Sequence, residues 1–182
     1  MDSRRLHTQR LTLTPVSTRD SQFFIELMNS PGWLEFIGDR NIQTVDDARE
    51  QIETVYARSF ETHGFGYHVI SDRSDGLRLG VCGILKRDNM PNPDLGFAML
   101  PAGQGQGFAY EACERLLRFV HATNAVTQLD AITRIDNLRS ISLLERLHFR
   151  RKHTENDGDE TLAHFYWDST AFDHASTSFE TE

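Results

Sequence analysis

The sequence predicts a single α/β domain, because three features recur along its 182 residues. Short segments of alternating apolar and polar residues, typical of half-buried strands, are interleaved with segments whose apolar residues repeat at helical spacing. Clusters of Gly, Pro, Asn and Asp separate the two kinds of segment. The expected order is strand, two helices, three strands in a meander, helix, strand, helix and two strands, which gives a sheet of about six to seven strands.

In the N-terminal part, Leu11 and Leu13 alternate with threonines over residues 10–16, which predicts a first strand ending near Pro15. A helix follows, with Ser17 or Thr18 as its cap, and ends in the turn-forming residues 29–32. The stretch 33–40 is expected to be a loop with a short helical turn.

A second helix is expected from Thr44 to about Glu61, because Thr44 precedes acidic residues suited to a first helical turn. Residues 65–71 and 77–86 then predict a hairpin, since the cluster from Asp72 to Gly76 favours a turn. The apolar residues expected on one face of these elements are Val45, Ala48, Ile52, Val55 and Tyr56 in the helix, and Phe65, Tyr67 and Val69 in the first strand of the hairpin.

In the C-terminal half, residues 94–100 predict a strand, and a long amphipathic helix begins at Phe108. A strand over 127–134 leads through Asp136 and Asn137 into a short helix. Two closing strands are placed near 149–154 and 161–168. The residues expected on one face of the first strand are Leu95, Phe97 and Met99, and the apolar stripe of the long helix consists of Ala109, Ala112, Cys113, Leu116, Leu117 and Val120. The expected buried edge of the short helix consists of Leu138, Ile141, Leu144 and Leu147.

Composition and charge restrict the classes of protein. The content of 38% hydrophobic residues indicates a chain that folds, and we expect one domain over residues 1–168 with a poorly ordered acidic tail over 169–182. The net charge of −8 has the wrong sign for binding nucleic acid; it would favour a cationic amine, although it can equally serve solubility. No apolar run has the length of a signal peptide or membrane span, so we expect a cytoplasmic protein with no membrane partner.

The two cysteines, Cys82 and Cys113, are distant in sequence and have no zinc-type spacing. Both fall on apolar faces of predicted elements. We therefore expect buried, unreactive thiols.

The segment DLGFAMLPAGQGQGFAYEA carries a glycine-rich turn between a strand and a helix. Gly103, Gly105 and Gly107 would permit positive φ angles and a close approach of the backbone to a ligand, and the new helix offers unpaired N–H groups. A Walker A loop is excluded because no Gly-Lys-Ser/Thr follows. A dinucleotide fingerprint, to which Asp130 would belong, fails because the glycines follow a meander. A purely structural turn stays open.

The wider pattern resembles the GNAT superfamily of N-acetyltransferases, in the branch that includes ribosomal-protein N-terminal acetyltransferases. The resemblance covers about Arg10 to Trp167 and includes TQRLTLTPVSTRD, the glycine segment and RIDNLRSISLLERLHF. It implies a mixed, mostly antiparallel central sheet with helices on both faces. It also implies direct transfer of an acetyl group from acetyl-CoA to a primary amine, without a metal or covalent enzyme intermediate, and is compatible with a homodimer.

The resemblance also implies site residues. The pantetheine arm of CoA would run beside a strand and the pyrophosphate would lie on backbone N–H groups of the turn, while Asn137 would contact CoA. The residues beside the pantetheine are Phe97, Ala98, Met99 and Leu100, and those at the pyrophosphate are Gln104, Gly105, Gln106, Gly107, Phe108 and Ala109.

Three residues depart from the family pattern. Ala102 replaces the Gln or Arg that often opens the phosphate loop, which leaves the backbone N–H groups in place. Leu144 stands where many relatives have a tyrosine that protonates the leaving thiolate, so Ser140 becomes the candidate acid. His148 replaces a glycine that would adopt a left-handed conformation.

Acyl transfer requires donors that polarise the thioester carbonyl, which backbone N–H groups near Ala98 and Met99 could supply. A base must also deprotonate the incoming ammonium. The candidates are Asp94, Glu35 and His68, each with a structural alternative: a strand end, a solvated loop carboxylate and a solvent-facing histidine.

Asn137 and Ser140 are three residues apart at the expected start of a helix and can project on one side of it. Helix capping is the alternative role for this pair, and it is compatible with binding CoA. Both residues are therefore candidates for the cofactor site and for catalysis.

Two other functions remain open. A non-catalytic module could hold acyl-CoA as a sensor, and a nucleotide-binding domain would prefer NAD or ATP to CoA. The acceptor could be a protein N-terminus, a polyamine, an amino acid or a drug-like amine.

Overall fold

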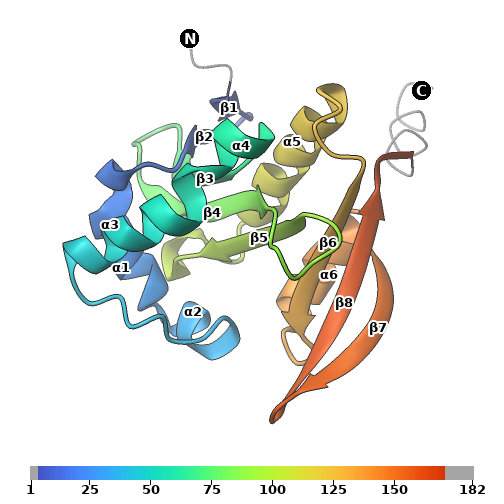
Figure 1. Ribbon diagram of the computed structural model, residues 1–182. Helices are drawn as coiled ribbons and strands as arrows, with labels where there is room; N and C mark the ends of the chain where they lie inside the picture. Colours follow the sequence, from blue (N-terminus) through green and yellow to red (C-terminus); the bar gives the residue numbers. More distant parts are fainter. Residues whose placement is uncertain (1–3, 171–182) are drawn as a thin grey trace.

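A computed structural model describes residues 4–170 of the protein. Its centre is one eight-stranded sheet in the order β1-β2-β3-β4-β5-β6-β8-β7 (Figure 1). All neighbouring strands are antiparallel except β5 and β6, which are parallel. The predicted mixed, mostly antiparallel sheet is confirmed, with one more strand than the largest expected number.

The strands are β1 (Leu6–His7), β2 (Leu11–Pro15), β3 (Tyr67–Asp72), β4 (Arg78–Leu85), β5 (Asp94–Met99), β6 (Gln128–Arg134), β7 (Arg150–Asp157) and β8 (Glu160–Asp168). The helices are η1 (Thr18–Asp20), α1 (Ser21–Met28), α2 (Pro31–Phe36), α3 (Val45–Gln51), η2 (Ile52–Ala57), α4 (Ser59–His63), η3 (Pro101–Gly103), α5 (Phe108–Ala122) and α6 (Leu138–Arg146). The additional strand is β1, which is too short to show a periodicity in the sequence.

The expected helix caps of the N-terminal half are present. The Ser17 backbone N–H donates to the Asp20 carboxylate over 2.9 Å, and Thr44 exchanges bonds of 2.7 and 3.1 Å with Asp47. The helix predicted from Thr44 onward is divided into α3, a π-helical turn η2, and α4. Gly64, with φ of 76°, ends it.

The predicted hairpin is formed by β3 and β4, and the Asp72 N–H donates to the Leu77 carbonyl across the turn over 2.9 Å. Phe65 was expected on the same face as Tyr67 and Val69, which is wrong. It lies before β3 begins and packs on the opposite side of the sheet, because strand alternation applies only within the strand.

The sheet separates two apolar cores, each covered by helices (Figure 1). One core lies beneath α5 and α6, and the other beneath α1, α2, α3 and η2. We call these the α5 face and the α1 face. On β5, Leu95 and Phe97 pack on the α5 face, while Ala98 packs on the α1 face. The helices therefore cover both sides of the sheet, as expected.

The long helix α5 presents a buried stripe to the sheet, as its periodicity predicts. The stripe consists of Phe108, Ala112, Cys113, Leu116, Leu117 and Val120, with Ala109 only half-buried. Cys113 and Cys82 are both fully buried, as expected, and they lie together: a hydrogen bond between the two thiols and burial raise the pKa of Cys113.

The C-terminal part corrects one residue of the predicted core. Leu138 is 71% exposed, because it occupies the first position of α6 and extends beyond the apolar cluster, whereas Ile141, Leu144 and Leu147 are buried. His148 adopts the left-handed conformation with φ of 66°. No helix within residues 4–170 is long and apolar enough to cross a membrane. Most of the expected acidic tail, residues 171–182, lies outside the described residues.

Candidate functional site

The strands β5 and β6 part from one another in the middle of the sheet. They are paired only at Asp94 and Asp130, where the Asp130 N–H donates to the Pro93 carbonyl over 2.9 Å. Beyond this point the two strands run apart (Figure 1). Residues 96–99 are half-buried although β5 is an inner strand. We call the region where β5 and β6 are no longer hydrogen-bonded to each other the opening, and residues 97–99, among those predicted to lie beside the pantetheine arm, lie along it.

The backbone of β5 offers hydrogen-bonding groups to this opening. Successive residues of a strand direct their N–H and C=O groups to alternate sides. The Pro93 carbonyl faces β6, and the Leu100 N–H donates to the Leu79 carbonyl of β4. By this alternation, the backbone N–H groups of Phe97 and Met99 face the opening. Of the two predicted donor positions, Met99 is on the side of the opening and Ala98 is on the side of β4.

The glycine turn, residues 102–107, connects η3 with α5. Gly105 and Gly107 have left-handed φ angles of 73° and 77°, as predicted, but Gly103 does not. Gly103 is required for a different reason: a Cβ there would lie 2.6 Å from Met99 Cε. Residues 104–107 are exposed, and α5 begins at Phe108. The N–H groups at the start of α5, the positive end of its helix dipole, are thus next to an exposed, glycine-containing turn that suits an anion.

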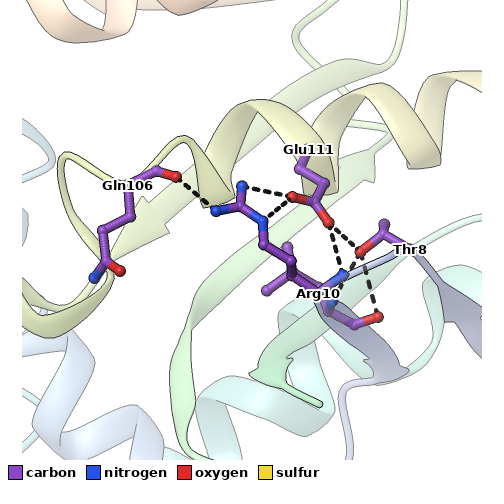
Figure 2. A network of polar contacts seen from close by, with 5 residues as sticks. Thr8, Arg10, Gln106 and Glu111 are labelled. Atoms are coloured by element: carbon purple, nitrogen blue, oxygen red, sulfur yellow. Dashed lines mark hydrogen bonds and ion pairs between the residues drawn. The ribbon is translucent and has the colours of Figure 1, made fainter. Parts of the chain in front are cut away.

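Two arginines that the sequence analysis missed lie beside this turn. Arg10 donates to the Gln106 carbonyl over 3.1 Å and forms a 2.6 Å ion pair with Glu111 (Figure 2). Its guanidinium lies 4.5 Å from the centre of the Phe108 ring. On α6, Arg139 donates to the Gln104 side chain over 3.3 Å. Arginine side chains therefore lie at both ends of the turn, with the charge of Arg10 balanced by Glu111.

Glu111 connects the start of α5 to the N-terminal strand. Its carboxylate accepts hydrogen bonds from the Thr8 hydroxyl over 2.5 Å and the Arg10 backbone over 3.1 Å (Figure 2). Burial alone would raise the pKa of Glu111, but the hydrogen bonds from Thr8 and Arg10 lower it below its ordinary value. The arginine at the glycine turn is thus held by an ionised carboxylate.

Asn137 and Ser140 occupy the N-terminus of α6. The Asn137 side chain caps the helix by accepting the Ser140 backbone N–H over 3.1 Å, so the structural role considered for Asn137 is present. Leu144, one turn further, is 1% exposed. The catalytic role of Ser140 and the CoA contact of Asn137 stay predictions.

Asp94 lies at the point where β5 and β6 meet, with its side chain on the α1 face. It is buried and forms bonds of 2.9 and 3.0 Å with Arg87. Burial raises the pKa of Asp94, and the positive charge of Arg87 offsets part of the rise. Its neighbour Asp130 is also buried and forms a 2.6 Å ion pair with Lys152.

The two other candidate bases are placed differently. Glu35 is exposed on α2, and its backbone carbonyl accepts from Arg134 on β6 over 2.8 Å, so α2 reaches the far side of the opening. His68 is fully buried, with its Nε2 2.8 Å from the Arg4 carbonyl oxygen. The expectation of a solvent-facing histidine is therefore wrong, because β3 is an inner strand.

Tyr67 is a further residue that the sequence analysis did not assign to the site. Tyr67, Gly83 and Gly96 are register neighbours on β3, β4 and β5. A Cβ at Gly83 would collide with the Tyr67 ring, and one at Gly96 would collide with its hydroxyl. The tyrosine therefore lies across two glycines with its hydroxyl over β5, where that strand borders the opening.

The divided sheet and the glycine turn are consistent with an acetyltransferase fold, and comparison with known proteins agrees. Residues 10–150 match the acetyltransferase (GNAT) domain model, so the chain belongs to the GNAT acetyltransferase family. It is 24% identical to the uncharacterized N-acetyltransferase p20 of Bacillus licheniformis over 149 residues, 81% of this chain and 83% of that protein.

Solved structures share the fold. An acetyltransferase from Agrobacterium tumefaciens superimposes with a TM-score of 0.77 at 21% identity, covering 92% of this chain and 95% of that one. RimL, a ribosomal L7/L12 α-N-protein acetyltransferase in complex with coenzyme A, superimposes with a TM-score of 0.78 at 13% identity, covering 90% and 97%. The mixed sheet, the GNAT family and acetyltransferase activity are thereby confirmed.

Proposed function

We propose that this acetyltransferase uses acetyl-CoA as its cosubstrate and acetylates a primary amine, either a protein N-terminus or a small-molecule amine, by direct attack on the thioester. The observation that supports this most strongly is the position of the glycine turn. The turn opens α5 just after β5, the strand that parts from its neighbour, so the proposed anion site follows directly on the strand that borders the opening.

The cosubstrate would bind along these two features. Backbone N–H groups of residues 104–109 would bind the pyrophosphate, with positive charge from Arg139 added at one end of the turn. The pantetheine would pair with β5 over residues 97–100. Asn137 and Ser140, at the start of α6, would border the same ligand.

The reaction proceeds by attack of the neutral amine nitrogen on the thioester carbonyl carbon. Backbone N–H groups of Phe97 and Met99 would stabilise the oxyanion, and the C–S bond then breaks. The Ser140 hydroxyl, or water, returns a proton to the thiolate. Asp94 would receive the ammonium proton on the α1 face, because its burial makes it more basic than an exposed carboxylate.

A sensor without turnover is the second candidate, favoured by the buried Leu144 in place of the tyrosine found in many relatives. A thiol-release assay with acetyl-CoA and a panel of N-terminal peptides, polyamines and small amines, run beside a calorimetric titration of CoA, distinguishes the two. Release of CoA that depends on one class of amine supports the transferase. Tight CoA binding without release for any amine supports the sensor, and absence of CoA binding contradicts both.

A further inference from the structure

We infer that Tyr67 is a catalytic residue whose hydroxyl donates a hydrogen bond to the carbonyl oxygen of the thioester; the inference rests on the proposed transfer function. The phenol lies on the α1 face of the sheet, over β5 at Gly96. Gly96 is half-buried and adjoins the stretch of β5 that is separated from β6. A carbonyl bound beside Phe97 would lie within the reach of this hydroxyl.

Two glycines on adjacent strands create the space for this arrangement. Tyr67 pairs with Gly83, and Gly83 pairs with Gly96, so the three residues form one row across the sheet. A glycine inside a strand weakens it, because it loses entropy on folding and packs no side chain. The Tyr67 ring occupies the space of both missing side chains. It places its hydroxyl over β5, two strands away from the Tyr67 backbone on β3.

The environment of Tyr67 makes it a donor that keeps its proton. Burial is the main reason why the pKa of Tyr67 lies well above its ordinary value of 10.0. A phenol this weakly acidic would lose its proton only unfavourably to a thiolate, whose conjugate thiol has a pKa of about 8.5. Stabilisation of the oxyanion, in which the proton stays on the phenol, is the remaining role.

In the proposed step, the amine lone pair forms the C–N bond while the carbonyl π electrons move to oxygen. Tyr67 and the β5 N–H groups stabilise that charge. The electrons then return to re-form C=O and expel the thiolate, which is protonated by Ser140 or water. The attacking nitrogen loses a proton to the base or to water as the amide forms, which balances the proton that the thiolate gains. Tyr67 is unchanged at the end, so the step needs no further reactant.

The test compares Tyr67→Phe with Tyr56→Phe. The ring of Tyr56 lies 4.9 Å from that of Tyr67 and is equally buried, so its variant controls for the loss of a buried hydroxyl in the same cluster. Loss of one oxyanion donor lowers kcat by about a hundredfold or more. We expect this fall for Tyr67→Phe, with an unchanged Kd for CoA and a pH profile of unchanged shape, and a change below about threefold for Tyr56→Phe.

A second measurement needs no acceptor. Infrared difference spectra of bound acetyl-CoA labelled with 13C at the carbonyl should show a higher stretching frequency in Tyr67→Phe than in the wild type or Tyr56→Phe. An unchanged frequency, or kcat within threefold of the wild type, would overturn the role of Tyr67. If the wild type acetylates no amine, the transferase proposal fails, while the frequency still decides the contact of Tyr67.

Discussion

Gly105 offers a clean perturbation of the glycine turn. Its φ is 73°, and a Cβ at this position would have no heavy atom within 4 Å, so Gly105→Ala introduces backbone strain without a clash. A left-handed conformation costs a non-glycine residue about 1–2 kcal/mol. We expect the free energy of unfolding to fall by about that amount.

The matched control is Gly64→Ala at the end of α4. Gly64 has φ of 76° and equally open surroundings, so the same strain is expected at a position outside the turn that opens α5. Both variants should therefore lose similar stability in urea unfolding. Only Gly105→Ala should weaken CoA binding.

The size of the binding defect follows from the contacts that the methyl group would remove. A hydrogen bond to a charged group contributes about 1.5–3 kcal/mol, and losing one such bond between the turn and a phosphate corresponds to about a tenfold to hundredfold rise in Kd. Calorimetric titration of CoA into the two variants measures this. Equal CoA affinity of Gly105→Ala and Gly64→Ala would refute the assignment of the turn to the pyrophosphate.

Three further predictions concern α5, α6 and their connections. Hydrogen bonds lower the pKa of Glu111 in the folded state, so its stabilising contribution is present above its ordinary pKa of 4.5 and is lost as the pH falls through the lowered value. In urea unfolding at several pH values, the free energy of unfolding of Glu111→Gln should therefore fall less at acid pH than that of the wild type. His148→Gly should raise the free energy of unfolding by up to about 1 kcal/mol and leave kinetics unchanged, because it removes the strain at φ of 66°; lower stability would contradict this. Ser140→Ala should lower kcat by about a hundredfold if the hydroxyl is the acid. The circular dichroism spectrum should stay unchanged, since the Asn137 cap uses the backbone N–H; an unchanged kcat would exclude the serine as the acid.

Local periodicity was sufficient to predict most of the fold. The stripe of α5 and the alternation of β5 follow from residues close in sequence, and both were correctly placed. Two of the errors occur where an element ends. Leu138 has the right spacing for the buried side of α6, but it lies beyond the core, and β1 has only two residues.

The candidate site was predictable where its parts are contiguous in sequence, as in the glycine turn. Arg10 and Tyr67 could not be found in this way. Arg10 meets Gln106 and Glu111 only because β2 lies against the start of α5, about a hundred residues away. Gly83 and Gly96 appear as two unrelated strand glycines until the strand register places Tyr67 across them.

The central claim is acetyl transfer from acetyl-CoA to an amine at the opening between β5 and β6. The most direct measurement is mass spectrometry of an amine panel after incubation with acetyl-CoA labelled with 13C in the acetyl group, with released CoA quantified in parallel. The account predicts a labelled acetyl amide on one class of primary amine in a one-to-one ratio with free CoA, and little product with Gly105→Ala at low acetyl-CoA. Free CoA without an acetylated amine, or no reaction with any primary amine despite CoA binding, would contradict it.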